Sequence, residues 1–262
     1  HPVPEQTSTA TIARGSDMKK TLSVLIVAHN EEKNLAACLE TLQFADEIVV
    51  VLDRCIDRSR QIAGQYTSQL VEGAWEREGP RRNTGIQSCT SDWILEVDAD
   101  ERVPPALARE IRTVIADAET GYFQIPFHNY IGRTLVRNGW GASWGVRSKA
   151  CLFAKNTKRW GDQRVHPEIT LPAFRGRLEN AIIHYVDKDI SDMIRRLDRY
   201  TTAMASDLRE SGSIGTFLHN LQRIPVRFFK CYILRKGFKE GGYGFLIALF
   251  AALMPMLAYL KA

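Results

Sequence analysis

Two carboxylates separated by one small residue follow an apolar run in the middle of the chain. Asp98 and Asp100 come directly after residues 93–97, Trp-Ile-Leu-Glu-Val. Because alternate side chains of a strand point the same way, we expect both carboxylates on one face at the strand's end. Such close like charges repel each other and favour a divalent cation, so a diphosphate with Mg²⁺ or Mn²⁺ fits this triplet. An acidic turn after a buried strand is the structural alternative.

Two further polar segments carry residues that could take part in chemistry. Residues 77–83 form a basic loop ahead of an expected helix. Arginines at a helix start oppose the helix dipole, which an anionic ligand would offset, although a solvated basic loop explains them equally well. Residues 161–168 form a polar loop with three proton-carrying side chains, Asp162, His166 and Glu168.

The elements that must position these residues alternate between strand and helix. Apolar runs predict strands at 22–28, 47–52, 69–72 and 93–97, and helices fill the intervals. Asn30 is the expected N-cap of the first helix. This order is typical of a doubly wound α/β fold with a mostly parallel sheet flanked by helices, whose ligands bind at the carboxyl ends of the strands. No Gly-x-Gly-x-x-Gly follows the first strand and no Gly-Lys-Ser/Thr loop is present, which disfavours a dinucleotide-binding domain.

The composition changes after Gly121. A strand at 122–127 leads into an aromatic, glycine-rich and basic region that contains Trp140, Trp144 and Arg147. Exposed aromatic rings near arginines suit a cleft for a sugar or phosphate acceptor, whereas a role in the core is the alternative for each Trp. Further strands are expected at 149–153 and 181–185, and a long helix at 190–209.

The last third of the chain is basic and apolar. Residues 221–232 alternate apolar and cationic side chains at helical spacing, as membrane-surface or partner-docking helices do. The apolar run 245–260 spans roughly 24 Å as a helix, which is less than the roughly 30 Å core of a bilayer. We expect it to dip into one leaflet or to pack on a second subunit. A homo-oligomer is therefore one of the alternatives. The long apolar run fits lipid better than nucleic acid.

Composition sets the outline of the molecule. The 262 residues, with a net charge of +5, suit one large α/β domain with an appendage. Five scattered cysteines without a Cys-x-x-Cys pair favour reduced thiols in a cytosolic setting. The expected organisation is a disordered tail at 1–20, a catalytic domain at 21–210 and a helical membrane-associating extension at 211–262. Within the domain, 21–120 is the nucleotide-binding half and 121–210 the acceptor half.

Five segments together resemble a known family. They are residues 25–32 (Leu-Ile-Val-Ala-His-Asn-Glu-Glu), 44–51 (Phe-Ala-Asp-Glu-Ile-Val-Val-Val), 81–83 (Arg-Arg-Asn), 97–103 (Val-Asp-Ala-Asp-Glu-Arg-Val) and 164–168 (Arg-Val-His-Pro-Glu). From about residue 22 to 209 the chain resembles the inverting family 2 glycosyltransferases of GT-A fold. Within them it is similar to bacterial lipopolysaccharide inner-core transferases, often described as β-1,4-glucosyltransferases. It departs from the family pattern at residues 52–57, which replace Asp-x-Gly-Ser-x-Asp, and at Pro167, which interrupts Val-His-Glu.

The resemblance implies a division of labour among the site residues. A nucleotide sugar, expected to be a UDP-sugar, would have its nucleoside held by Ala28, Asn30, Glu31 and Asp53, and its diphosphate by Asp98 and Arg82. A divalent metal would be bound by Asp98 and Asp100, with His166 as a further ligand. Glu168, with Asp162 as second choice, would deprotonate the acceptor hydroxyl from the face opposite the leaving group. The acceptor would be a glycolipid at the cytoplasmic face of the inner membrane, where the enzyme would be peripheral or monotopic.

Three other functions compete with this interpretation. A polyprenyl-phosphate glycosyltransferase would share the nucleotide half and also need a membrane tail. A non-catalytic membrane-surface scaffold would keep the fold and bind no sugar nucleotide. A phosphatase of the Asp-x-Asp-x-Thr/Val type is disfavoured because Arg102 occupies the fifth position and the doublet follows a late strand.

Overall fold

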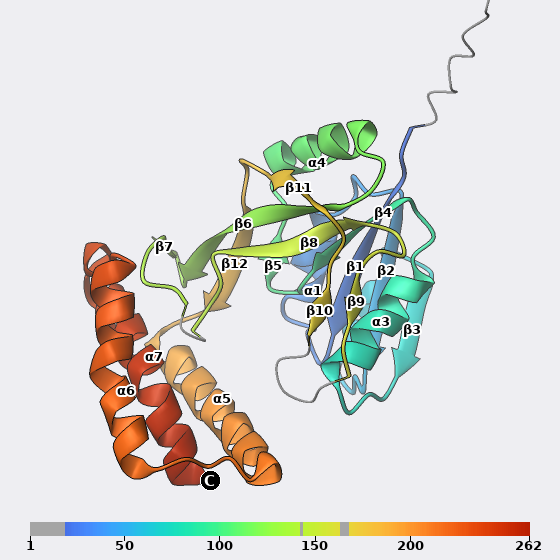
Figure 1. Ribbon diagram of the computed structural model, residues 1–262. Helices are drawn as coiled ribbons and strands as arrows, with labels where there is room; N and C mark the ends of the chain where they lie inside the picture. The colour runs from blue at the N-terminus through green and yellow to red at the C-terminus, as the bar shows by residue number, and fades with distance from the viewer. Residues whose placement is uncertain (1–18, 142–143, 163–167) are drawn as a thin grey trace, which may run out of the picture.

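A curled mixed sheet forms the centre of the computed structural model, which describes residues 19–141, 144–162 and 168–262 (Figure 1). Its strands run in the order β3-β2-β1-β4-β8-β6-β12-β5, with β7 and β11 paired to β6. These strands are β1 (Leu22–Ala28), β2 (Glu47–Asp53), β3 (Gln69–Gly73), β4 (Trp93–Val97), β5 (Glu101–Arg102), β6 (Tyr122–Ile131), β7 (Thr134–Val136), β8 (Ser148–Ala154), β11 (Phe174–Arg177) and β12 (Ile182–Asp187). A separate two-stranded ribbon joins β9 (Arg159–Trp160) to β10 (Ile169–Thr170).

Helices cover the sheet and extend beyond it. They are α1 (Leu35–Glu40), α2 (Ser59–Ala63), α3 (Glu78–Ser88), α4 (Pro105–Asp117), α5 (Ile190–Ser211), α6 (Phe217–Phe229) and α7 (Gly241–Lys261), with a π-helical turn at Lys230–Leu234 and a 3₁₀ turn at Gly237–Glu240. The predicted α/β fold, with a flanked sheet and a helical C-terminal extension, is confirmed. The predicted tail at 1–20 falls almost entirely outside the described residues.

Strands β1 to β4 are parallel; β1, β2 and β4 are buried on both faces, whereas the edge strand β3 is partly exposed. In β1, Val24 and Ile26 pack toward α1, whereas Leu25 packs with Ile86 of α3. Burial on both faces explains why these strands are continuous apolar runs in the sequence. The helix α3 lies so close to β1 that a Cβ atom at Gly85 would come within 2.5 Å of Leu25 Cδ1.

Asn30 is not the N-cap of the first helix. The helix α1 begins at Leu35 with Asn34 before it, and Asn30 adopts a left-handed backbone with φ of 56°. The Asn30 Oδ1 atom accepts a hydrogen bond of 2.9 Å from the backbone N–H of Ile56. The side chain therefore ties the loop after β1 to the loop after β2 instead of capping a helix.

The strand β8 runs antiparallel to both of its neighbours, β4 and β6. Because Leu95 pairs with Leu152, the amino-terminal end of β8 lies beyond the carboxyl end of β4. Similarly, β12 pairs antiparallel with the short strand β5, and His184 stands opposite Glu101. Topology alone thus delivers side chains from two later strands to the acidic turn after β4.

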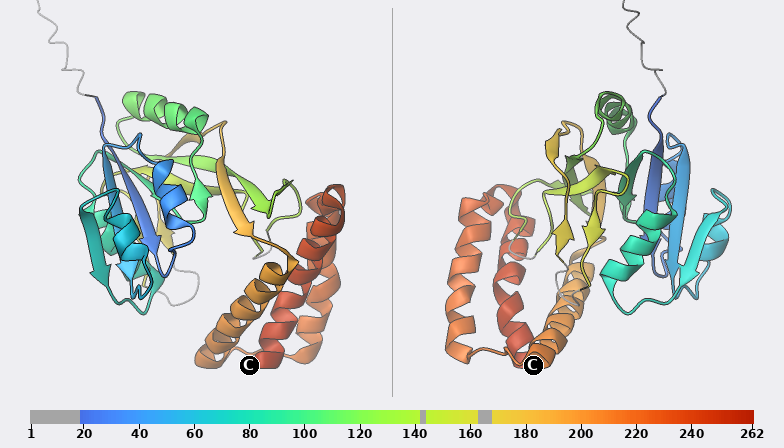
Figure 2. Two further views of the ribbon diagram at one scale, coloured as in Figure 1. Left: turned by 180° about the vertical axis from the view of Figure 1, so that it is seen from behind. Right: turned by 45° about the vertical axis from the view of Figure 1, so that its right-hand side comes forward.

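The helices α5, α6 and α7 form a layer beside the sheet, with α7 between the other two (Figures 1 and 2). Trp140 and Trp144 are buried in the core that this layer shares with the end of β6. The suggested aromatic acceptor cleft is therefore wrong for these two rings, which pack on α7 and α5. The Gly237–Lys261 segment is long and apolar enough to cross a membrane, yet over half of its most apolar window is buried inside the protein. Membrane association of the extension stays a prediction.

A buried ion pair fastens α5 to the sheet. Arg196 donates two hydrogen bonds to Asp187 at the end of β12, at 2.9 and 2.6 Å, and its guanidinium lies 4.0 Å from the centre of the Trp144 ring. Burial raises the pKa of Asp187, and the ion pair with Arg196 is the main interaction that lowers it. Losing one partner of such a pair leaves an uncompensated buried charge.

We predict that Arg196→Met lowers the free energy of unfolding by about 3–5 kcal/mol, because Asp187 would then be buried without its partner. Urea denaturation measures this value. The matched control is Arg195→Met on the same helix, whose exposed pair with Asp192 should be worth less than about 1 kcal/mol. Equal losses in the two variants would contradict the assigned role of the buried pair.

Candidate active site

A pocket of about 510 Å³ opens where β1 and β4 end, between the sheet and α5. Its lining comprises Val27, His29, Glu31, Arg81, Arg82, Asp98, Ala99, Asp100, Gly145, Val146, Lys149, His184, Val186, Arg196, Arg199 and Tyr200. Open α/β sheets bind ligands at this carboxyl edge. Another hollow of about 650 Å³, which includes Thr21, Asp46 and Ser91, lies at the opposite edge, where the parallel strands begin. We therefore place the active site in the pocket of about 510 Å³ at the carboxyl edge of the sheet.

Asp98 is held between two cations. Arg82 donates to its Oδ1 atom at 3.2 Å, and Lys149 donates to its Oδ2 atom at 2.7 Å. Burial alone would raise the pKa of Asp98, but Lys149 and Arg82 outweigh it and hold that pKa well below its usual range. Asp98 is therefore ionised, and both of its oxygens are already engaged within the protein.

Glu101 is buried beside Asp98 and shares Lys149 with it. Its Oε1 atom accepts from Lys149 at 2.6 Å and its Oε2 atom accepts from the backbone N–H of Asp98 at 3.0 Å. Burial raises the pKa of Glu101 to about 7, and the nearby Asp98 charge adds to the effect against the opposing pull of Lys149. Lys149 thus bridges two carboxylates that would otherwise repel each other in a buried position.

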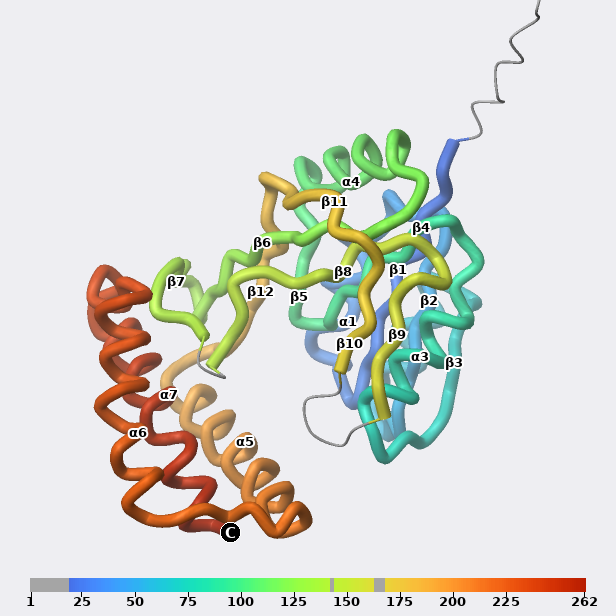
Figure 3. The backbone as a smooth tube through the Cα atoms, in the orientation of Figure 1, coloured from blue at the N-terminus to red at the C-terminus, as the bar shows by residue number. Residues whose placement is uncertain are grey.

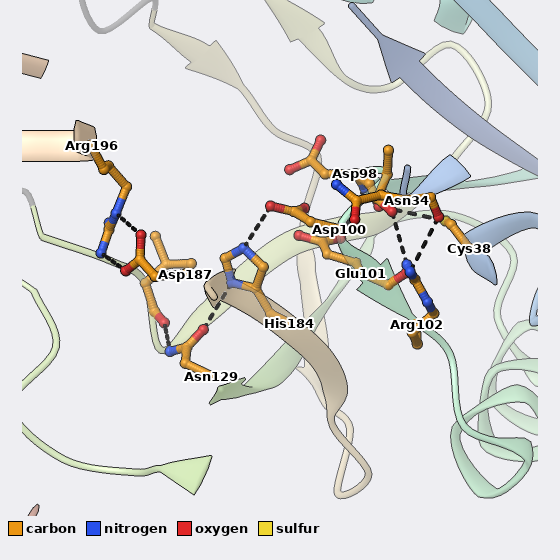
Figure 4. A network of polar contacts seen from close by, with 12 residues as sticks. Asn34, Cys38, Asp98, Asp100, Glu101, Arg102, Asn129, His184, Asp187 and Arg196 are labelled. Carbon is orange, nitrogen blue, oxygen red and sulfur yellow. Dashed lines mark hydrogen bonds and ion pairs between the residues drawn. The ribbon is translucent and has the colours of Figure 1, made fainter. Parts of the chain in front are cut away.

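Asp100 has a different environment, in which it faces His184 (Figure 4). The Nε2 atom of His184 lies 3.5 Å from Asp100 Oδ2. On its other side, His184 Nδ1 is 2.9 Å from Asn129 Oδ1, while Asn129 Nδ2 donates to the carbonyl of Val146 at 2.7 Å. Because the Asn129 amide donates to a carbonyl, its oxygen must accept from the Nδ1–H of His184, which leaves Nε2 directed at Asp100.

These contacts fit a divalent cation. A metal-binding His usually donates its second ring N–H to a neighbouring oxygen, as His184 does to Asn129. Asp100, Glu101 and His184 bring one potential ligand atom each within 4.8 Å of one another. Since both Glu101 oxygens have partners in the protein, Asp100 and His184 remain the better ligands, with a nucleotide diphosphate and water able to complete the coordination sphere.

The expected nucleoside residues lie together at the ends of β1 and β2. Asp53 is fully buried, and its carboxylate accepts from Arg54 at 3.0 Å, from Arg81 at 2.8 Å and from the backbone N–H of Trp75 at 3.1 Å. Burial would raise the pKa of Asp53, but these hydrogen bonds outweigh it and lower that pKa. The Nε–H of Arg81 is buried without a hydrogen-bond acceptor among the described residues. Among the described residues that line the pocket, it is the one buried side-chain nitrogen or oxygen atom without a hydrogen-bond partner.

The other members of the nucleoside group have structural contacts as well. The carbonyl of Ala28 lies 3.5 Å from Cys55 Sγ, and Glu31 accepts from the Asn34 side chain at 2.9 Å. Burial raises the pKa of Glu31, which lines the pocket. The loops after β1 and β2 therefore form one wall of the site.

The two candidate bases lie elsewhere among the described residues. Asp162 and Glu168 line a separate hollow of about 710 Å³ together with Trp160. Asp162 is exposed and forms an ion pair of 2.8 Å with Arg77. Residues 163–167, including the expected metal ligand His166, lie outside the described residues. The structure thus brings Asp98, Asp100 and Arg82 together and leaves the base as a prediction.

Sequence reasoning missed His184, Asn129, Lys149 and Glu101. His184 stands in a predicted strand, and its signal was a polar residue near the carboxyl end of that strand. Lys149 carried no comparable signal, because only the antiparallel pairing of β8 with β4 brings it to Asp98.

The comparisons with known proteins identify the family of the chain. The family model described as glycosyl transferase family 2 matches residues 23–167. The lipopolysaccharide core biosynthesis glycosyltransferase LpsC of Rhizobium meliloti is 23% identical over 257 residues, which cover 93% of this chain and 92% of that protein. An uncharacterized glycosyltransferase of Rickettsia felis is 23% identical over 254 residues, covering 92% and 88%. The structure of S. aureus TarS 1-349 in complex with UDP is 14% identical with a TM-score of 0.49, covering 84% of this chain and 75% of that chain.

The fold and the acidic strand end define a sugar-transferring enzyme that uses a nucleotide sugar. The chain belongs to glycosyl transferase family 2 and has the GT-A type of fold. It is similar to enzymes of lipopolysaccharide core biosynthesis.

Proposed function

We propose that this glycosyltransferase moves a sugar, with inversion, from a UDP-sugar to a lipopolysaccharide-core or similar glycolipid acceptor, and that it requires Mg²⁺ or Mn²⁺. The observation that carries the proposal is the array Asn129–His184–Asp100 at the carboxyl edge of the sheet. It leaves a nitrogen and a carboxylate facing each other, as a divalent cation requires. The similarity to LpsC, which is named for lipopolysaccharide core biosynthesis, supports the acceptor class.

Within this proposal, Asp100 and His184 would hold the cation, which would supply Lewis acidity at the departing diphosphate. Asp98 does not compete for it, because Arg82 and Lys149 occupy both of its oxygens. Those two cations also offset the negative charge of the inner wall of the pocket, where a diphosphate would lie. Arg81, which also lines the pocket, adds another cationic side chain beside an anionic ligand.

The nucleoside lies, in this account, against the loops after β1 and β2. Direct contact of a base with Asp53 requires Arg54 or Arg81 to move away from that carboxylate. Arg54 is the one free to do so, because its side chain is 53% exposed, against 23% for Arg81. Asp53 thus has two roles in the proposal: it orients Arg81 and it receives the base.

The acceptor hydroxyl is deprotonated by a carboxylate on the side opposite the leaving diphosphate. Glu168 remains the first choice and Asp162 the second. The ribbon β9–β10, which carries both residues near its ends, is hydrogen-bonded from Asn83 of α3 to Trp160 at 2.7 Å. This contact ties the proposed base to the same helix that bears Arg81 and Arg82.

We predict that UDP-sugar binding and turnover depend on the metal at Asp100 and His184. Asp100→Asn and His184→Ala should each lower the transfer rate about a thousandfold and abolish the Mn²⁺-dependent part of UDP binding in calorimetry. The matched control is His128→Ala, because His128 is exposed on the neighbouring strand β6 and does not line the pocket. Full activity in EDTA, or in either variant, would refute the metal site.

We predict that Glu168→Gln abolishes transfer while UDP-sugar still binds, because the amide cannot accept the hydroxyl proton. Asp162→Asn is the paired variant and should retain most activity. Rates with a lipopolysaccharide-core acceptor, together with donor affinity from calorimetry, provide the measurement. The opposite pattern of rates would transfer the role to Asp162, and activity with polyprenyl phosphate instead would change the acceptor class.

A further inference from the structure

The helix α6 and the turns that follow it expose several large apolar side chains. We define the outer face as Phe217, Leu218, Leu221, Val226, Phe229, Ile233, Leu234 and Phe238, each of which is at least 42% exposed. Leu218, Leu221, Phe229 and Ile233 fall at spacings of three, four or eight residues and so lie along one side of the helix. Soluble monomers rarely expose such a contiguous patch without a binding partner.

The outer face lies at the edge of the molecule that is farthest from the sheet. In both views α7 separates α6 from α5 (Figures 1 and 2), and the chain path shows α6 rising into the turns that lead back down α7 (Figure 3). The apolar residues of α7, such as Ile247, Ala251 and Met254, are buried against the other two helices. The exposed apolar surface of the extension thus belongs mainly to α6 and the turns after it.

Charge identifies the partner of this face. Residues 212–262 contain seven Lys or Arg residues and a single acidic residue, Glu240, so they carry more than the net +5 of the whole chain. Glu240 accepts hydrogen bonds from Asn138, so it is engaged within the protein. Lys230, Lys236 and Lys239 are exposed beside the apolar residues, and none has an ion pair among the described residues.

A second copy of the chain fits this face poorly. A symmetric dimer would place the same patch on both sides, and the lysines of one copy would face those of the other. An anionic bilayer can bind both kinds of side chain. Its acyl chains contact the apolar side chains, and its anionic head groups attract the lysines.

We propose that the outer face of α6 and its following turns lies on an anionic lipid surface, while α7 stays inside the protein. The sequence predicted contact through both the basic amphipathic stretch and the apolar run 245–260, whereas the contact proposed here uses only the first of these segments. Since α5 lines the active-site pocket through Arg199 and Tyr200, the three-helix layer would hold that pocket at a fixed place above the lipid. This last consequence rests on the proposed glycolipid acceptor, whereas lipid binding itself does not.

The test is sedimentation of the full-length chain with vesicles of equal parts phosphatidylcholine and phosphatidylglycerol, and with vesicles of phosphatidylcholine alone. We expect the chain to bind the mixed vesicles most strongly at low salt. High salt should remove the part of the binding that comes from charge and leave the part that comes from apolar contacts. Lys236→Glu with Lys239→Glu should weaken binding to mixed vesicles about tenfold or more. Leu218→Glu with Val226→Glu should remove the salt-resistant part.

Two controls isolate the face. Lys33→Glu with Lys188→Glu changes the net charge equally on exposed lysines elsewhere, and Ile56→Glu changes an apolar side chain that is 93% exposed on the nucleotide half. Both should bind as the wild type does, and UDP binding in calorimetry should be unchanged in all variants, which separates this test from that of the proposed activity.

Three results would overturn the proposal. One is a wild-type chain that stays in the supernatant with mixed vesicles at low salt. Another is undiminished vesicle binding by both the Lys236→Glu, Lys239→Glu chain and the Leu218→Glu, Val226→Glu chain, which would place the contact on α7 or elsewhere. The third is a dimer in size-exclusion chromatography that the Leu218→Glu, Val226→Glu chain loses, without any vesicle binding, which would make the face an interface between copies.

Discussion

The repulsion among three carboxylates at one strand end is the constraint on which the site depends. Asp98, Asp100 and Glu101 lie within four consecutive residues; Glu101 is buried, whereas Asp98 and Asp100 are partly exposed. Lys149 joins Asp98 to Glu101, and Arg82 adds a second cation to Asp98. Only Asp100 keeps a carboxylate directed at the pocket without a Lys or Arg partner among the described residues. The protein thus neutralises the inner part of the cluster itself, and in the proposed function Asp100 is left to bind a divalent cation.

The sheet topology makes this neutralisation feasible. Lys149 is about fifty residues from Asp98 in the sequence, yet the antiparallel pairing of β8 with β4 places it there. His184 is delivered in the same way, by the pairing of β12 with β5. The second half of the sheet therefore extends the core and also brings Lys149 and His184 to the acidic turn. The Asp187–Arg196 pair then fixes α5, and with it the far wall of the pocket, to the same strand that carries His184.

Much of this could be predicted from the sequence, and the limits have physical causes. The parallel strands were predictable because burial on both faces makes them continuous apolar runs, and the Asp98–Asp100 pair was predictable from its position after such a run. The predicted N-cap role of Asn30 was wrong because Asn suits both an N-cap and a left-handed turn. The hydrogen bond to the loop after β2 selects the turn, and this contact is not visible in the local sequence. Trp140 and Trp144 were ambiguous because the helix that buries them, α7, lies a hundred residues away in the chain. His184 and Lys149 depend on strand pairing, which no local pattern encodes.

The central claim is that a divalent cation is bound through a nitrogen of His184 and a carboxylate oxygen of Asp100. The most direct measurement is pulsed electron paramagnetic resonance of Mn²⁺ bound to the full-length chain with UDP, prepared with ¹⁵N-labelled histidine. The account predicts hyperfine coupling from one histidine nitrogen and from the UDP phosphorus nuclei, with the nitrogen coupling lost in His184→Ala. Bound Mn²⁺ that shows phosphorus coupling but no coupling to nitrogen, or nitrogen coupling that survives in His184→Ala, would contradict it.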